Sequence, residues 1–316
     1  MAKQQSGCKT LLKFGCIGCL GLLVLLLIIA GVVYGIAWSA VQNEQVEKRE
    51  LAHELEFFEP VGDEDLPLEV PSEFVDPTLA AGRIVLDLSH TKFDVVPAAP
   101  GEPLMIKAEF DTNNYTLSES FVEAVGDEGW IYEVEFERTT DSYALTVLKE
   151  LLGGTKPRVK IYLPRDVPFD LEASFLQGGA EVELGGLWLV NADVEFLQGG
   201  GALDISEPLR EPAESLRIDF TQGGGAIQGL GNASPRSLEV SFSMGGGFVD
   251  LRGAWQNDAE IEIEQSMGGV TLQLPRNVII RGLKGRDTPQ PAEGEESLPV
   301  LRFSTSSCMG ELEILN

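Results

Sequence analysis

The chain has 316 residues, of which 43% are hydrophobic and 8% aromatic, so it can bury a sizeable core and is too apolar for a disordered protein. It carries 50 acidic and 23 basic side chains, a formal net charge of −27. Such an acidic surface repels nucleic acid and anionic lipid, and it leaves cations, basic proteins and neutral glycans as partners.

Residues 14–38 ("FGCIGCLGLLVLLLIIAGVVYGIAW") contain no charged side chain. As a helix they would extend about 37 Å, enough to cross a hydrocarbon core of roughly 30 Å. Lys3, Lys9 and Lys13 all precede this stretch, so the positive-inside rule predicts a cytoplasmic segment at 1–13, a single-pass span at 14–38 in the cell membrane, and an extracytoplasmic remainder. Cleavage as a signal peptide, with Ala37 and Ser39 as the small residues, is the alternative, although the apolar stretch is longer than usual for one.

Three of the four cysteines, Cys8, Cys16 and Cys19, lie before or within the cytoplasmic end of this stretch. Only Cys308 lies in the predicted extracytoplasmic portion, so no intrachain disulfide framework can hold that portion together. We expect its stability to come from packing.

Residues 39–81 are predicted to form a stalk and a linker. Apolar residues within 41–58 recur near helical spacing, which predicts that the helix continues as a short stalk. Four prolines and many acids follow in "PVGDEDLPLEVPSEFVDP", which indicates a semi-rigid spacer.

Residues 82–164 alternate between apolar and polar side chains, the pattern of strands with one wet face. The predicted strands are "RIVLDLS", "LMIKAEF", "WIYEVEFER", "SYALTVL" and "RVKIYLP". In the third, Trp130, Tyr132, Val134 and Phe136 share one face. We expect an antiparallel β region.

Residues 165–316 contain a repeat of about 22 residues, seen in "SFLQGGAEVEL", "EFLQGGGALDI", "DFTQGGGAIQG" and "SFSMGGGFVDL". The first glycine of each unit falls at Gly178, Gly199, Gly223, Gly245 and Gly268, with Gly310 in a degenerate sixth unit. Three residues before it stand Phe175, Phe196, Phe220 and Phe242, followed by Gln265 and Ser307. The segment 282–299 interrupts the last spacing and is predicted to be an insertion loop.

A period of two inside a period near 22 predicts coils of strands whose like residues stack at about 4.8 Å. The predicted fold class is therefore all-β: a short single-coil β-solenoid (β-helix) with an antiparallel N-terminal β region and one N-terminal transmembrane helix. The glycines are predicted to be structural, at corners that need positive φ or close approach between coils. A phosphate loop or a calcium nonapeptide repeat is excluded by context and period.

The segment "RVKIYLPRDVPFDLEASFLQGGAEVELGGL" and the units after it resemble bacterial toast-rack or putative-adhesin domains, including those of cell-wall-stress membrane proteins. The resemblance covers residues 82–316. It implies a β-helix held outside a membrane, with envelope-stress sensing, adhesion or protein docking as its role, and no catalytic residues to transfer. The single N-terminal span departs from the multi-helix membrane region of that family.

The chain has two histidines, His53 and His90, both outside the repeats, so a His and Cys metal site is excluded. The sequence offers no catalytic, cofactor-binding or metal-ligating set, and we predict that the protein is not an enzyme and takes no cofactor. The alternative is a carbohydrate-active β-helix enzyme that uses surface carboxylates such as Asp219, Glu239, Asp250 or Glu262.

The favoured hypothesis is a membrane-anchored extracytoplasmic interaction or adhesion-type module of the bacterial cell envelope, with envelope-stress sensing as one role. Its expected partners are an envelope protein or a glycan, or a second copy of the chain bound at the terminal coil edge. The glutamines before the first three corners, Gln177, Gln198 and Gln222, are predicted to form an amide ladder.

Overall fold

A computed structural model of the chain describes residues 6–55, 80–123, 129–139, 148–149, 151–284 and 298–315, with side chains described from Leu22 onward. The predicted spacer at 56–79, nearly all of the predicted strand at 142–148, and most of the insertion loop at 282–299 lie outside the described residues. The chain divides into two compact units. One contains Met1–Val46, Asp111–Asn114 and Thr140–Lys156, and the other contains Glu47–Phe110, Tyr115–Thr139 and Pro157–Asn316.

The N-terminal element is a single helix, α1 (Ser6–Gln42). Its segment Leu22–Gln42 has a mean hydropathy of 2.5 and is long enough to cross a membrane. The helix predicted at 14–38 is therefore confirmed. By length and composition it fits a membrane anchor or a signal sequence.

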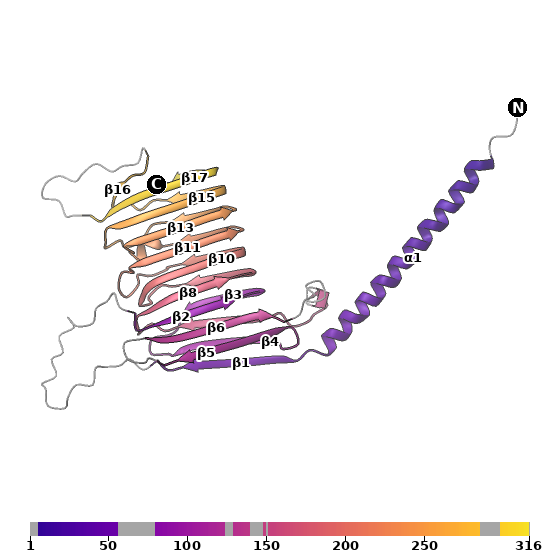
Figure 1. The fold of residues 1–316 in the computed structure, drawn as a ribbon, viewed down its shortest axis with the longest axis horizontal. Coiled ribbons are helices and arrows are strands. Elements are labelled where there is room, and N and C mark those ends of the chain that lie inside the picture. The colour runs from indigo at the N-terminus through magenta and orange to yellow at the C-terminus, as the bar shows by residue number, and fades with distance from the viewer. Residues whose placement is uncertain are drawn as a thin grey trace. The chain divides into compact units, whose positions relative to one another are not determined.

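Most of the rest of the described chain is β structure, in one sheet of 17 strands (Figure 1). The strands are β1 (Val46–His53), β2 (Gly82–Leu88), β3 (Thr91–Pro97), β4 (Leu104–Asp111), β5 (Tyr115–Val122), β6 (Trp130–Arg138), β7 (Arg158–Leu163), β8 (Phe169–Phe175), β9 (Gly178–Glu183), β10 (Leu189–Asp204), β11 (Ser215–Gln222), β12 (Gly225–Gln228), β13 (Ser237–Met244), β14 (Gly247–Asp250), β15 (Ala259–Gln273), β16 (Ile279–Arg281) and β17 (Val300–Leu315). A short 3₁₀ helix, η1 (Leu230–Asn232), follows β12.

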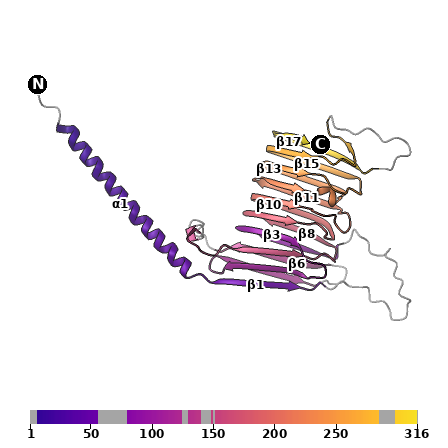
Figure 2. The same cartoon turned by 180° about the vertical axis from the view of Figure 1, so that it is seen from behind.

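The repeat units pair in parallel and in register, one after another. Strands β8, β10, β11, β13, β15 and β17 form consecutive pairs, and both views show them in this order (Figures 1 and 2). Phe196 is registered with Phe220, and Phe220 with Phe242. The alignment predicted from the 22-residue period is confirmed residue by residue.

The aromatic ladder of these units is buried. The rings of Phe196 and Phe220 stack with centroids 4.5 Å apart and an interplanar angle of 5°, and those of Phe220 and Phe242 stack at 4.9 Å and 3°. Phe175 extends the stack at 5.2 Å from Phe196. All four rings are at most 4% exposed, so they form one continuous apolar column.

The corner glycines have two separate reasons to lack a side chain. Gly199, for example, has φ of +130°, and a Cβ built on it would lie 1.8 Å from the carbonyl oxygen of Gly178 in the preceding unit. Two positions further on, the Phe196 ring fills the space where a Cβ on Gly201 would lie, at 2.2 Å. The prediction of structural glycines at corners is confirmed.

The predicted fold class is wrong in its architecture, although the all-β content with one N-terminal helix agrees. The strands form a closed parallel six-strand barrel with extra strands, and not an open single-coil β-solenoid. Both halves of each repeat point apolar side chains at one interior, as Phe220 and Ile227 do, so the wall closes around a shared core. The repeat period in the sequence predicts which residues of successive strands are paired, but it does not predict whether the sheet closes into a barrel.

The N-terminal β region is likewise not simply antiparallel. Strand β2 pairs in parallel with both β6 and β8, and β3 pairs in parallel with β7 and β9, so this region continues the same sheet as the repeats. Antiparallel pairing is limited in the described registers to β4 with β7 and β5 with β6.

The prediction of a helical stalk within residues 41–58 is also wrong, because Val46–His53 forms strand β1. This strand pairs with β4. Two cross-strand ion pairs accompany the pairing: Lys48 to Glu109 at 3.2 Å and Lys107 to Glu50 at 3.1 Å. Cross-strand partners of this kind favour a strand over a helix although the local apolar spacing is near helical.

The smaller unit contains a buried ion cluster next to the end of α1. The ammonium group of Lys149 contacts the carboxylate of Asp111 and lies 3.2 Å from that of Glu44. The backbone N–H groups of Gln45 and Asn113 donate to Asp111. Burial alone would raise the pKa of Asp111, but Lys149 and these two N–H groups outweigh it and the pKa is lowered.

Candidate functional site

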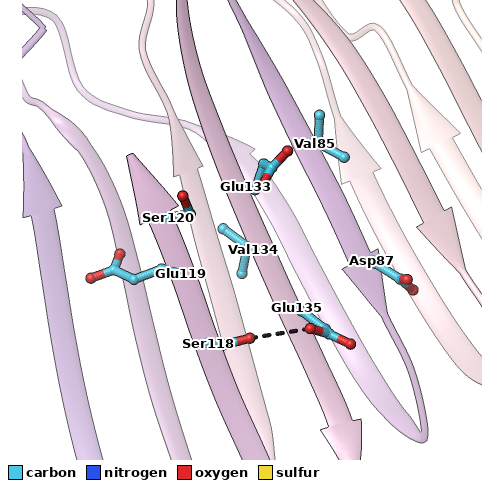
Figure 3. Close-up of a pocket in the computed structure, with 8 residues that line it drawn as sticks. All are labelled: Val85, Asp87, Ser118, Glu119, Ser120, Glu133, Val134 and Glu135. Carbon is cyan, nitrogen blue, oxygen red and sulfur yellow. Dashed lines mark hydrogen bonds between the residues drawn. The ribbon is translucent and has the colours of Figure 1, made fainter. Parts of the chain in front are cut away.

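A groove of about 400 Å³ lies along strands β2, β5 and β6 (Figure 3). It is lined by Val85 and Asp87 from β2, by Ser118, Glu119 and Ser120 from β5, and by Glu133, Val134 and Glu135 from β6. All eight residues belong to the larger unit. Because it combines a concave shape with four carboxylates, we take this groove as the candidate functional site.

The carboxylates reach the groove because β6 alternates. Tyr132, Val134 and Phe136 are buried, so Glu133 and Glu135 point to the opposite face. The faces predicted for this strand are thus confirmed.

The neighbouring strands set two polar rows across the groove. In one row, Ser118 of β5 and Asp87 of β2 flank Glu135. In the other, Ser120 and Val85 flank Glu133. The parallel pairing of β2 with β6 is what brings carboxylates from distant parts of the chain side by side.

The electrostatics of the first row favour a positively charged ligand. The hydroxyl of Ser118 donates to Glu135 at 3.3 Å, as Figure 3 shows, and supplies no positive charge. Asp87 lies opposite Glu135 on the adjacent strand, and like charges placed directly opposite destabilise a sheet. None of the eight lining residues is basic. A Lys or Arg side chain from a partner would relieve this repulsion.

Glu119 is engaged differently and points away from the Ser118–Glu135 pair in Figure 3. The buried hydroxyl of Tyr132 donates to its carboxylate at 2.7 Å, and Nε2 of His53 lies 3.2 Å from the same oxygen. Burial and the neighbouring Glu119 raise the pKa of Tyr132, so its hydroxyl remains a donor. The His53 ring stacks on Phe121 at 5.0 Å. Glu119 therefore serves to hold β1 against β5 and β6. This leaves Asp87, Glu133 and Glu135 as the groove carboxylates without a basic partner among the described residues, although Glu135 accepts the hydrogen bond from Ser118.

Of the four acids named for the enzyme alternative, Asp219, Glu239 and Glu262 lie near one another on the adjacent strands β11, β13 and β15, whereas Asp250 lies apart from them on β14. Arg217 contacts both Asp219, at 2.8 Å, and Glu239, at 3.5 Å. Arg252 holds Asp250, and although burial opposes it, this guanidinium lowers the pKa of the Asp250 carboxyl. Glu262 is exposed and registered beside Glu239 on the next strand. Three of the four are thus already paired with arginine.

A second acidic cluster lies on the repeats. Carboxylate oxygens of Asp193, Glu195 and Asp219 lie within 4.8 Å of one another. Burial raises the pKa of Asp193, with Arg217 lowering it and Asp219 raising it further. Because Arg217 also binds Asp219, and the hydroxyl of Ser241 donates to the same carboxylate, the cluster is partly neutralised from within.

The predicted amide ladder is present at its first step. The side-chain amide of Gln177 donates to that of Gln198 at 3.0 Å, and Gln198 is registered with Gln222. Cys308 is a free, exposed thiol on β17.

The sequence pattern does not predict the groove. Alternating acids on a strand also describe any solvated face, and nothing local shows that β2 lies beside β6. The signal that was available is the run of three outward glutamates at Glu133, Glu135 and Glu137 on a strand whose other face is entirely apolar.

No protein-family model and no curated protein matches the sequence. Among solved structures, the chain is similar to a putative cell adhesion protein from Clostridium sporogenes at 13% identity and a TM-score of 0.37, over 85% of this chain and 99% of that one. It is also similar to a putative adhesin from Bacteroides fragilis at 10% identity and a TM-score of 0.38, over 86% of this chain and 97% of that one. A putative adhesin from Parabacteroides merdae matches at 11% identity and a TM-score of 0.27, over 87% and 98% of the two chains.

Proposed function

We propose that this chain is an extracytoplasmic adhesion-type module, held at the bacterial cell membrane by α1, that binds a basic partner protein through the groove of β2, β5 and β6. The observation that carries the proposal is the set of three carboxylates, Asp87, Glu133 and Glu135, in a groove whose described lining residues include no basic side chain. In this proposal the module binds its partner and catalyses nothing.

The scaffold suits recognition by a preformed surface. The groove rests on a strand whose inward side chains, Tyr132, Val134 and Phe136, are at most 2% exposed. Side chains anchored in a packed sheet lose little freedom on binding, which lowers the entropy loss of association.

Charge selects the class of partner. With a formal net charge of −27, two copies of the chain repel each other, whereas a basic envelope protein is attracted and steered toward the acidic face. A narrower form of the same proposal is envelope-stress sensing, in which binding of the partner in the groove signals the state of the cell envelope. A relation to toast-rack domains is also part of the proposal.

The test uses the full chain in nanodiscs of zwitterionic lipid and a fluorescent oligolysine peptide, with binding followed by anisotropy. The groove variant combines Asp87→Asn, Glu133→Gln and Glu135→Gln. The control variant combines Glu260→Gln, Glu262→Gln and Glu264→Gln on β15, which are three exposed, alternating acids that change the net charge by the same amount.

We expect the groove variant to raise the Kd about tenfold, because three exposed ion pairs contribute about 0.5 kcal/mol each. The control variant should change it much less. Equal weakening by both variants would show that the peptide responds to net charge alone, and it would overturn the proposal, as would a groove variant that binds like the native chain.

A further inference from the structure

The corner positions that precede the glycines change character along the repeats. In the first three units this slot holds Gln177, Gln198 and Gln222, and in the last three it holds Met244, Met267 and Met309. We call the second set the methionine ladder. It contains three of the five methionines in the whole chain.

The methionine ladder is in register. Met244 of β13 is paired with Met267 of β15, and Met267 is paired with Met309 of β17, all in parallel. Neighbouring strands of a sheet lie about 4.8 Å apart, so equivalent side chains project side by side at that spacing. Met267 is the middle member, with one thioether on each side of it.

All three side chains are accessible. Met244 and Met267 are each 39% exposed and Met309 is 68% exposed. Glycines follow the first two at the corner, Gly245 with Gly246 and Gly268 with Gly269, so the residues that come directly after Met244 and Met267 carry no side chain. A purely structural apolar residue would be expected to be buried, as Phe242 is, two residues before Met244 on β13.

The chemistry of three adjacent thioethers is specific. A thioether sulfur is a soft, uncharged ligand that selects Cu(I) over Zn²⁺, Mg²⁺ and Ca²⁺, which prefer imidazole, carboxylate or carbonyl donors. The Met side chain is unbranched and flexible, so the outer two sulfurs can swing toward the middle one across a strand spacing. The acidic protein surface adds a general attraction for cations.

We propose that Met244, Met267 and Met309 form a surface site for a single soft monovalent metal ion, Cu(I), with Met267 as the central ligand. The ion binds as it is supplied, and no electron is transferred. This site lies on β13, β15 and β17, and it is independent of the acidic groove and of the proposed partner.

The test uses the full chain in detergent with Cys8→Ser, Cys16→Ser, Cys19→Ser and Cys308→Ser, so that no thiol competes for the metal. Cu(I) is titrated anaerobically with ascorbate against a chromophoric chelator. We expect one Cu(I) per chain, with sulfur-only ligation in X-ray absorption spectra and no comparable binding of Zn²⁺.

Met267→Leu keeps the volume and removes the sulfur, and it should lower the Cu(I) affinity at least about tenfold, the loss typical of a perturbed metal site. Two substitutions are the matched controls and should leave the Cu(I) affinity unchanged. They are Met105→Leu on β4 and Gln222→Leu, which lies in the equivalent slot of the unit before Met244. Circular dichroism of each variant checks that the fold is kept. An absence of Cu(I) binding in the four-serine chain, or an affinity unaltered when all three ladder methionines are leucine, would overturn the proposal.

Discussion

The corner glycines test what holds the repeats in register, because alanine substitutions at two neighbouring glycines of one corner should have opposite effects on stability. A Cβ on Gly199 would lie 1.8 Å from the carbonyl oxygen of Gly178, and the φ of Gly199 is +130°. A Cβ on Gly200 would lie 3.2 Å from the carbonyl oxygen of Gly224, a tight contact that a shift of a few tenths of an ångström relieves. Both residues are exposed and both lie in β10.

The expected energies follow from these contacts. In Gly199→Ala, a positive φ costs about 1–3 kcal/mol for a residue with a side chain. The clash is with backbone, so β9 and β10 must separate by about 1 Å at the corner, and each parallel hydrogen bond lost there costs about 0.5–1.5 kcal/mol. We expect the free energy of unfolding to fall by about 3 kcal/mol or more. In Gly200→Ala, reduced freedom of the unfolded chain contributes about 0.4–1 kcal/mol of stability and offsets the mild contact.

The assay is urea unfolding of the full chain in detergent, followed by the fluorescence of the buried residues Trp130 and Trp255. If Gly199→Ala unfolded within about 1 kcal/mol of Gly200→Ala, the corner would be free to move. The close approach of successive units would then not be what fixes their register.

Two further predictions concern the two units separately. Phe220→Ala removes a ring that is 1% exposed and stacked on both sides, and it should lower the free energy of unfolding by about 3–5 kcal/mol, with Phe220→Leu intermediate. Urea titration measures both variants. A loss below about 1 kcal/mol for Phe220→Ala would contradict the buried aromatic column. The lowered pKa of Asp111 means that its contribution to stability is complete above the ordinary carboxyl pKa of 3.8 and is lost as the pH falls through its folded value. The protection factors for hydrogen exchange at residues 43–46, which are corrected for the pH dependence of intrinsic exchange, should therefore fall below about pH 4 in the native chain. In Asp111→Asn they should already be low at neutral pH and change little on acidification. A fall in protection preserved in that variant would exclude Asp111 as its source.

The register of the repeats was predictable because it depends on chemistry that repeats with the sequence. Like residues stack on like in parallel in-register strands, so a phenylalanine every 21 to 24 residues implies the column that Phe196, Phe220 and Phe242 form. The glycines were predictable for the same reason, since positive φ and backbone contact recur at one slot in each unit.

The closure of the wall and the pairing of the first strands were not predictable in this way. Alternation shows that a strand has a wet and a dry face, but not which strand lies beside it or in which direction. Strand β2 therefore looked like part of an antiparallel region, whereas it pairs in parallel with β6 and β8. The acidic groove depends on that pairing, so neither the topology nor the groove could be predicted from the sequence pattern.

Strand β1 shows how partners override a local pattern. Its residues alternate only between half-buried and exposed, and four charged side chains lie in its middle, which is typical of a solvated helix or of a strand at the margin of a sheet. Three contacts stabilise the strand over a helix. Lys48 and Glu50 form ion pairs with β4, and His53 contacts Glu119. None of these partners lies within 50 residues of β1, so no local rule could include them.

The same stacking logic explains why the two ends of the aromatic column differ. In the fifth unit the ring is replaced by Gln265, which is 4% exposed and whose amide oxygen and nitrogen have no hydrogen-bond partner among the described residues. A buried, unpaired amide costs about 1–3 kcal/mol, so the units of β15 and β17 gain less from packing than those before them. Met267 and Met309 lie on these two strands, where β17 is exposed along most of its second half. A metal ion that joined Met244 to Met267 and Met309 would tie this weaker end to the well-packed β13, and mass action would then stabilise the strands in which Gln265 and Ser307 replace the stacked phenylalanines.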